Sequence, residues 1–378
     1  MKVTCLQENF AKGLSIVGRA VATRSPYPVL ANILLTSDRG ALKLAATDFE
    51  TSIMCWVSAK VEEEGAITIP ARTLSDLVNN LPPEQVILSL DDKTHTMHIA
   101  CYRTEATIKG IDYQEFPLMP EADKENRIKI ETALLKEMIG QVTFAAATDD
   151  TRPTLTGIST RFAGDTITMA ATDGFRLSVR TAKLPQIVEK PVEVIIPAKS
   201  LNELARVAGP EQEYVYISFP EGRNQVIFDM ESIVVIINLV ADGPFPDYSA
   251  VVPKKRKTRT VLNTAEFAKA CKMADIFARE ASHTARVRIE PGDEITPSHT
   301  TITASSTETG GNMAQLDAIV DGDAIEIAFN VKYMTDVLNV VGTPQVAIET
   351  LSPMDPGVIR PVGNDNFTHV IMPMHFGR

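Results

Sequence analysis

The tetrapeptide Ala45-Ala46-Thr47-Asp48 returns as Ala170-Ala171-Thr172-Asp173, 125 residues further along the chain, with a weaker relative at Ala304-Ser305-Ser306-Thr307. Two other motifs recur in the same order: Pro70-Ala71-Arg72 as Pro197-Ala198-Lys199 and Asn330-Val331-Lys332, and Phe116-Pro117 as Phe245-Pro246 and Met372-Pro373. The steps lie close to one third of the 378 residues. Motifs that recur at a fixed period in a fixed order indicate a chain of three repeats.

Each repeat contains two amphipathic helix patterns. Apolar residues at i, i+3, i+4 and i+7 predict six helices, with stripes that begin at Phe10, Leu74, Leu135, Leu201, Phe267 and Met334. Small residues such as Gly13 lie on these stripes and allow a helix to approach a sheet closely. Between the helices the apolar pattern changes to period two, broken by turn clusters, which is typical of antiparallel hairpins.

The order of these patterns predicts an α+β fold of three repeated domains. Each domain comprises two strand-helix-three-strand units, with the helices on one face of antiparallel sheets. The polar segments 119–127 and 253–259 read as linkers. The expected domains are therefore 1–128, 129–257 and 258–378.

Composition excludes several classes of protein. Lys and Arg number 37 against 48 Asp and Glu, a formal net charge of −11, which argues against nucleic-acid binding by the whole surface but permits a locally basic face. No apolar run is long enough to span a membrane, and Met1–Leu6 reads as a strand instead of a signal peptide, so a cytoplasmic location is expected. Four widely spaced cysteines predict reduced, buried thiols.

Catalytic and metal-binding motifs are missing from the sequence. No glycine-rich phosphate loop, nucleophile elbow or zinc-binding His pair occurs. Asp149-Asp150 reads as a solvated junction after a helix, and Cys271 as a core thiol. Asp48 and Asp173 recur by symmetry, which suits a turn better than a catalytic centre. We therefore expect no catalytic residue, no metal and no cofactor.

Basic residues on the predicted helices and at their ends form candidate DNA-facing stripes. Glu137, Glu203 and Asp336 dilute these stripes, and charge for solubility explains them equally well. The run 254–259 is strongly basic and reads as a solvated linker. The candidate DNA-facing residues are Lys12, Arg19, Arg24, Arg72, Arg152, Lys199, Arg206, Lys269, Lys272, Arg279 and Lys332.

Several motifs resemble one family along the whole chain. They are Ala171-Thr172-Asp173-Gly174-Phe175-Arg176-Leu177, Asp242-Gly243-Pro244-Phe245-Pro246-Asp247-Tyr248, Phe329-Asn330-Val331-Lys332-Tyr333 and the ending Val370-Ile371-Met372-Pro373-Met374. Together with the threefold repeat, they resemble the bacterial DNA polymerase III beta subunits, the sliding clamps.

The resemblance implies a head-to-tail homodimer that closes into a ring around duplex DNA without sequence specificity. Such a ring tethers the replicative polymerase and gives it processivity, as an accessory subunit that has no catalysis of its own but is classed with the nucleotidyltransferase it serves. Six helices packed about 10 Å apart leave a hole of only ~9 Å, whereas twelve leave ~28 Å, so two chains are needed to admit a duplex. For the joint between repeat 1 and repeat 3 we expect the strand Thr104–Lys109, with Ala106 and Ile108, and the helix residues Ile276 and Phe277.

The resemblance also implies a peptide pocket that binds the polymerase III alpha subunit, clamp-loader subunits and repair proteins. Phe175 stands where the family commonly has His, and Ala250 where many members have Arg. The end His375–Arg378 also departs from the family, so partner preference can differ. The expected pocket residues are Leu155, Thr172, Gly174, Phe175, Arg176, Leu177, Pro246, Val251, Ile371, Met372, Pro373 and Met374.

Two other functions fit the sequence. One is an enzyme of nucleic-acid metabolism that uses Asp149, Asp150 or Asp173. The other is a repeat scaffold that binds proteins but never DNA, for which missing catalytic motifs are equally natural. A core between two domains would likewise explain many of the apolar pocket positions.

Overall fold

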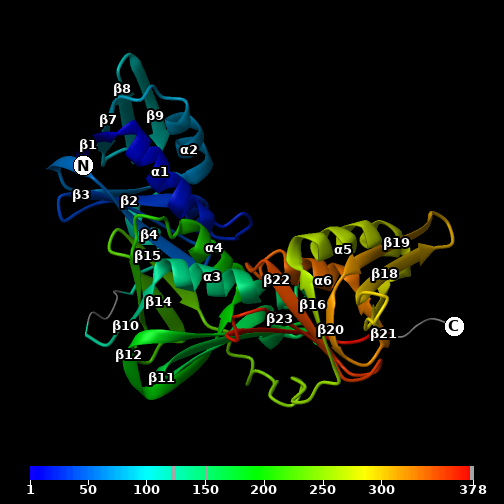
Figure 1. The fold of residues 1–378 in the computed structure, drawn as a ribbon. Helices are drawn as coiled ribbons and strands as arrows, with labels where there is room; N and C mark the ends of the chain where they lie inside the picture. The colour runs from blue at the N-terminus through cyan, green and yellow to red at the C-terminus, as the bar shows by residue number, and fades with distance from the viewer. Residues whose placement is uncertain (121–124, 150, 375–378) are drawn as a thin grey trace. The chain divides into compact units, whose positions relative to one another are not determined.

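The computed structural model describes residues 1–120, 125–149 and 151–374 (Figure 1). The chain forms two compact units, of which the first comprises Met1–Leu135 with Lys199–Leu239 and the second Lys136–Ala198 with Val240–Arg378. The central third of the sequence is therefore shared between the two units. Three parts of the sequence considered above lie outside the described residues: 121–124 of the expected linker, Asp150, and the C-terminal end His375–Arg378.

The first unit follows the expected order of strand, helix and strands. Its elements are β1 (Lys2–Leu6), α1 (Gln7–Val17), β2 (Asn32–Asp38), β3 (Ala41–Thr47), β4 (Thr51–Val57), β5 (Ala59–Glu63), β6 (Ala66–Pro70), α2 (Ala71–Asn79), β7 (Gln85–Asp91), β8 (Thr96–Cys101), β9 (Thr104–Lys109), β10 (Ile128–Glu131), α4 (Ala198–Val207), β13 (Tyr214–Ser218), β14 (Gln225–Asp229) and β15 (Ile233–Asn238).

Two antiparallel sheets form the first unit. One has the strand order β5-β1-β7-β8-β9, and the other β10-β13-β14-β15-β4-β3-β2-β6. In the larger sheet β15 pairs with β4, with Val235 opposite Ile53, so strands from the first and the central repeat share one sheet. Strand β9 has a neighbour on one side only and forms the edge of the smaller sheet, as expected from the sequence.

The second unit contains most of the first half of the central repeat, the last residues of that repeat and the third repeat. Its elements are α3 (Thr132–Val142, which begins in the first unit), β11 (Gly157–Thr172), β12 (Arg176–Pro197), β16 (Thr258–Asn263), α5 (Thr264–Ala278), β17 (Thr284–Glu290), β18 (His299–Ser306), β19 (Gly310–Asp317), β20 (Ile319–Gly322), β21 (Ile325–Asn330), α6 (Val331–Leu338), β22 (Gln345–Thr350), β23 (Gly357–Pro361) and β24 (Phe367–Ile371).

The sheets of the second unit are again antiparallel. The strand orders are β11-β12-β24-β23-β22-β16-β20 and β19-β18-β17-β21. Helices α5 and α6 share a core with these sheets, in which Phe267, Phe329 and Phe367 are almost fully buried. Each of the two helices begins at an asparagine cap, since Asn263 accepts hydrogen bonds from the amides of Ala265 and Glu266, and Asn330 from those of Lys332 and Tyr333.

Strand number after α3 differs from the sequence-based prediction. Between the two helices of a repeat the prediction gives four strands, three that close one unit and one that opens the next. The structure has two long strands here, β11 and β12, and five strands at the same place in the other two repeats, β2–β6 and β17–β21. The ladder of β11 and β12 continues past irregularities on both sides of Gly164, whose φ is +57°. A bulge of this kind bends a strand without ending it, which is why the predicted hairpin turns merge into the long strands.

The small residues on the helix stripes have the predicted effect. Helix α1 crosses β3 and β4 so closely that a Cβ on Gly13 would lie 2.6 Å from Val57 Cγ2 and 2.8 Å from Leu44 Cδ1. No side chain fits there without displacing these two residues. The stripe Phe10, Leu14 and Val17 is buried beside it.

Candidate functional site

An apolar pocket of about 220 Å³ opens in the second unit beside the turn between β11 and β12. We call it the apolar pocket. It is lined by Arg152, Leu155, Thr172, Gly174, Arg176, Leu177, Pro246, Asp247, Tyr248, Val251, Val370 and Met372.

Asp173 shapes the turn that carries one wall of the pocket. Its Oδ1 accepts hydrogen bonds from the amides of Phe175 (2.9 Å) and Arg176 (3.0 Å). Asp48 Oδ1 does the same with the amides of Glu50 and Thr51 in the first repeat. The turn role predicted from the repeated motif is therefore confirmed for both aspartates.

Gly174 completes this turn with a φ of +93°, a conformation that favours glycine. A Cβ here would lie 3.1 Å from Arg152 Nη1. The Arg152 guanidinium also donates to the Asp173 carbonyl oxygen at 3.1 Å. Arg152 was expected to face DNA, and the structure places its side chain at this pocket.

The Arg176 side chain is fixed from several directions and is only 11% exposed. Its Nε lies 2.9 Å from Asp173 Oδ2, and its Nη1 2.6 Å from Asp336 Oδ2 on α6. Its Nη2 donates to the Phe144 carbonyl at 2.6 Å, and the guanidinium lies over the Tyr333 ring at 4.3 Å. Two carboxylates and a carbonyl therefore position one cation, which makes a rigid pocket wall.

The far wall comes from the C-terminal strand, β24. Leu177 on β12 pairs with Val370, and the Met372 amide donates to the Phe175 carbonyl at 2.9 Å. Burial raises the pKa of the Tyr248 hydroxyl, which keeps this side chain neutral against the apolar wall.

Most of the expected pocket residues lie together, but four do not line the cavity. Phe175 lies beside it with 60% of its surface exposed, and Ile371 is buried in the core under α5 and α6. Pro373 and Met374 are half-buried, and the Met374 amide donates to the Ala328 carbonyl. Sequence reasoning missed Asp247, Tyr248 and Val370 as lining residues, although all three lie inside the motifs that carried the resemblance.

The remaining candidate DNA-facing residues are all exposed. In the first unit, carboxylates partner several of them: Lys12 with Glu211 at 2.5 Å, Arg19 and Arg206 with Glu203 at 3.0 and 2.5 Å, and Lys199 with Glu50 at 4.0 Å. Arg72 and Arg279 pair within their own helical segments with Asp76 and Asp275.

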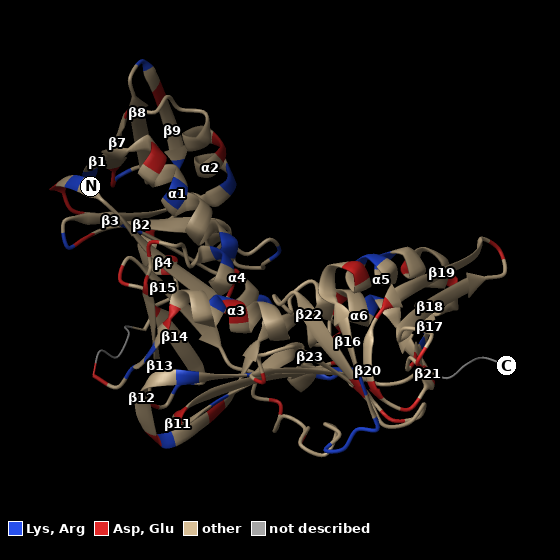
Figure 2. Ribbon diagram, in the orientation of Figure 1, with Lys and Arg blue, Asp and Glu red and all other residues tan. Residues whose placement is uncertain are grey.

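Charge on the remaining helices is mixed. Figure 2 shows residues of both charges along α5. Lys269 and Lys272 on this helix are exposed. Arg24 lies in the loop after α1 and Lys332 in the first turn of α6. The exposed ion pairs of the basic residues in the first unit are weak, so these side chains can readily exchange a carboxylate for another anion.

The residues expected at a joint between chains differ in exposure. On β9, Ala106 is half-buried and Ile108 is 8% exposed. On α5, Ile276 is 56% exposed, whereas Phe277 packs against the core. The edge strand β19 also exposes Met313, at 73%, which sequence reasoning had not singled out.

The other sites considered are a metal site and a reactive cysteine. Within residues 1–120, 125–149 and 151–374, no group of three or more His, Cys, Asp or Glu could hold a metal ion. All four cysteines are free and buried, as predicted, and burial raises the pKa of Cys5 to about 12 and of Cys55 to about 11. In the described part of the chain, no helix combines the length and apolarity that crossing a bilayer requires.

The fold and the pocket define the class: a protein of three α+β repeats with an apolar pocket on its surface. Models of the DNA polymerase III beta subunit match all three repeats, the N-terminal domain at residues 1–120, the central domain at 129–247 and the C-terminal domain at 249–375. The chain therefore belongs to the DNA polymerase III beta subunit family.

Individual relatives agree along the whole length. The beta sliding clamps of Staphylococcus aureus and Bacillus subtilis are each 29% identical and align with 99% of this chain and 99% of their own. Crystal structures of the sliding clamps from Bacillus subtilis (TM-score 0.93) and Pseudomonas aeruginosa (TM-score 0.90) are each 28% identical and cover all of both chains. The resemblance and the three-domain clamp fold are confirmed, and with them a function as a DNA clamp in replication.

Proposed function

We propose that two copies of this chain join head to tail into a ring that encircles duplex DNA and slides along it, tethering the replicative polymerase. The observation that carries the proposal is the three-domain fold, which matches DNA polymerase sliding clamps over the full chain. We keep the domain boundaries near residues 128 and 258 and expect the ring to work in the cytoplasm.

The two sheet edges support a joint between chains. Strand β9 ends one sheet of the first unit and β19 ends one sheet of the second, so each has one edge that no other described strand pairs with. Exposed edges tend to pair with another strand. Joining unlike surfaces in a closed ring leaves no free end from which a filament could grow.

Sliding needs attraction without a fixed grip. Exposed side chains such as Lys269 and Lys272 can approach phosphates through water, and such contacts carry no sequence information. Partner carboxylates such as Glu203 and Glu211 weaken the attraction further. Retention would then come from the closed ring, with no reaction catalysed by the chain itself.

The apolar pocket is the proposed docking site for the polymerase III alpha subunit, the clamp loader and repair proteins. Its Met, Val, Leu and Pro side chains suit a short apolar peptide, and methionine adapts to more than one shape. The fixed Arg176 would orient the polar part of the peptide.

Chemical closure of the ring tests the proposal. A variant with Ala106→Cys and Ile276→Cys is treated with a bifunctional maleimide, and the buried native cysteines should stay unreactive. We expect crosslinked protein to stay on nicked circular DNA in denaturing detergent and to leave when the circle is cut. The two variants that carry only one of the introduced cysteines serve as controls. A crosslinked dimer that retains no circular DNA would favour the protein-only scaffold.

A further inference from the structure

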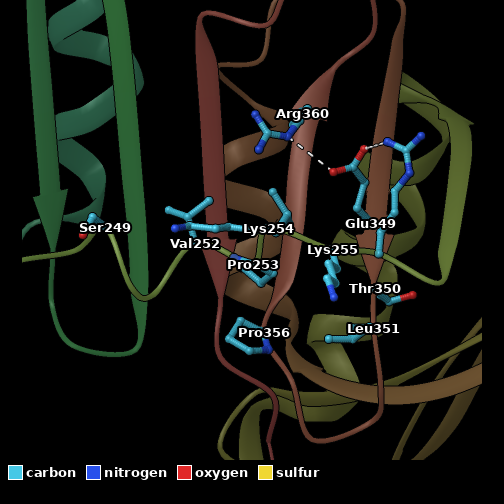
Figure 3. Close-up of a pocket in the computed structure, with 12 residues that line it drawn as sticks. Ser249, Val252, Pro253, Lys254, Lys255, Glu349, Thr350, Leu351, Pro356 and Arg360 are labelled. Atoms are coloured by element: carbon cyan, nitrogen blue, oxygen red, sulfur yellow. Dashed lines mark hydrogen bonds and ion pairs between the residues drawn. The ribbon is translucent and has the colours of Figure 1, made fainter.

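A second pocket, of about 520 Å³, lies in the second unit between the segment before β16 and the strands β22 and β23 (Figure 3). We call it the basic pocket. Lys254, Lys255 and Arg256 contribute from the segment, Glu349 from β22 and Arg360 from β23. Part of the basic run 254–259, whose composition predicts a solvated linker, therefore lines a pocket.

The basic pocket lies on the side of its sheet away from α5 and α6. Val346, Ile348 and Ile359 belong to the core that these helices cover. Glu349 and Arg360 alternate with them along β22 and β23, so their side chains point to the other face. DNA held on the α5 and α6 side would not reach this face, so encircled duplex is not its occupant.

Positive charge is in excess around a single carboxylate. Glu349 is paired with Arg256, with Arg360 at 3.4 Å and with Arg259 at 3.7 Å. The Glu349 side chain is only 14% exposed, so its carboxylate is fixed at the base of the pocket and positions the guanidinium groups that pair with it. Lys254 and Lys255 are exposed, and neither forms an ion pair with any described residue. The site therefore has unneutralised, pre-positioned cations on a chain with a net charge of −11.

Part of the pocket wall is aliphatic. Val252, Pro253, Leu351 and Pro356 line it, and no aromatic residue is among the described lining residues. Single-stranded nucleic acids bind through basic grooves combined with aromatic rings that stack on the bases. Arginine pairs with carboxylates as well as with phosphates, and short aliphatic side chains of a peptide would fit the aliphatic part of the wall.

The neighbouring site also points to a protein. Tyr248 and Val251 line the apolar pocket, whereas Ser249 and Val252 line the basic pocket, so one segment contributes to both walls. A protein chain seated in the first would pass the second. This one argument rests on the docking function proposed above, whereas the charge and wall arguments stand alone.

We propose that the basic pocket is a second docking site, which binds an acidic segment of a protein partner. Carboxylates of the segment would pair with Arg256, Arg360, Lys254 and Lys255, and its aliphatic side chains would rest against Pro253 and Pro356. The chemical class of the ligand is a peptide that alternates glutamate or aspartate with leucine or valine.

Fluorescence anisotropy with a labelled peptide, Glu-Glu-Leu-Glu-Glu-Leu-Glu-Glu, tests the site in the full chain at about 50 mM salt. Lys254→Glu combined with Lys255→Glu should weaken binding about tenfold or more, and Arg360→Gln at least about threefold. The matched control, Lys183→Glu with Lys190→Glu, makes the same change of charge on exposed lysines of β12 and should change affinity less than about twofold. Leu155→Ala, which removes part of the apolar pocket wall without adding charge and lies outside the residues that line the basic pocket, should leave this binding intact and so separates the two docking sites.

Other occupants give different results. Equal weakening in the Lys183 and Lys190 control would mean that only overall charge attracts the peptide. Tighter binding of an oligothymidylate of equal length would assign the pocket to nucleic acid. A loss of oligomer mass in the Lys254 and Lys255 variant would assign it to a second copy of the chain. Each of these results overturns the proposal. Because Lys254 and Lys255 are exposed, the double variant should keep the melting temperature of the parent chain, and this measurement shows that the variant is folded.

Discussion

Arg176 shows how one residue can hold a site. Asp173 and Asp336 both pair with it, and Phe144 and Tyr333 cover its faces. Removing the cation leaves two carboxylates close together with little access to water.

Arg176→Met should therefore lower the free energy of unfolding by about 3 kcal/mol, because an unpaired, poorly solvated carboxylate is costly. Urea unfolding of the variant and the parent chain measures this change. Arg223→Met, an exposed arginine in a turn, is the control and should lie within about 0.5 kcal/mol of the parent. An equal effect of both substitutions would show that the Arg176 contacts contribute nothing specific.

His369 predicts a dependence of stability on pH. It is fully buried, its Nδ1 lies 2.7 Å from Ser178 Oγ, and burial lowers its pKa to about 3. The unfolded chain binds this proton near pH 6.5, so between about pH 6.5 and 3 the unfolded state holds more protons than the folded state. Stability from the neutral ring is complete above pH 6.5 and is lost as pH falls, by up to about 1.4 kcal/mol per pH unit.

His369→Asn cannot take up this proton, so its acid loss of stability should be shallower than that of the parent. Denaturant unfolding at a series of pH values gives the slope directly. His98→Asn replaces an exposed histidine and should keep the parent slope. Parallel slopes for all three chains would contradict the assigned role of His369.

Charged substitutions in the apolar pocket should weaken the docking of partner proteins. Met372→Glu or Val251→Glu places a charge against apolar walls and should weaken binding of the polymerase III alpha subunit at least about tenfold. Surface plasmon resonance with the immobilised alpha subunit measures the affinity. Met354→Glu changes an exposed methionine outside the lining residues and should have little effect. Unchanged binding by both pocket variants would move the docking site elsewhere.

At the scale of elements, helix stripes were the most predictable feature. Phe10, Leu135 and Phe267 begin stripes that are buried, because burial of one helix face leaves its period in the sequence. The pairing of β12 with β24 leaves no such local trace, since Leu177 and Val370 lie 193 positions apart in the sequence. Arg152 illustrates the same limit: its charge suggested DNA, but tertiary contacts decide where the side chain lies.

Two helical glycines predict opposite effects of the same substitution. Gly13→Ala puts a methyl group against Val57 and Leu44 and should destabilise the chain by about 1–3 kcal/mol, more than its gain in helix propensity. Gly140→Ala on α3 meets no atom within 4 Å and should stabilise by up to about 1 kcal/mol. Thermal unfolding of both variants shows the signs. Stabilisation by Gly13→Ala would mean that α1 has room to move off its sheet.

At the scale of the whole molecule, the proposed joint can be tested by mass. Ile276→Asp puts a charge on an exposed apolar side chain of α5 and should weaken dimer formation at least about tenfold, without unfolding the chain. Sedimentation equilibrium over a range of concentrations measures the association. Ile295→Asp, at a side chain that is 93% exposed in a loop, should leave the mass unchanged. A parent chain that is monomeric at every concentration would remove the basis of the ring.

The proposed ring would hold DNA by enclosing it. A direct measurement is the lifetime of labelled protein, loaded once and then diluted, on closed circular DNA and on linear DNA of equal length and sequence. We expect the protein to stay far longer on the circle, because a closed ring leaves linear DNA by sliding off an end while its contacts with phosphates are the same on both. Equal lifetimes on the two substrates would contradict enclosure and would mean that surface contacts hold the DNA.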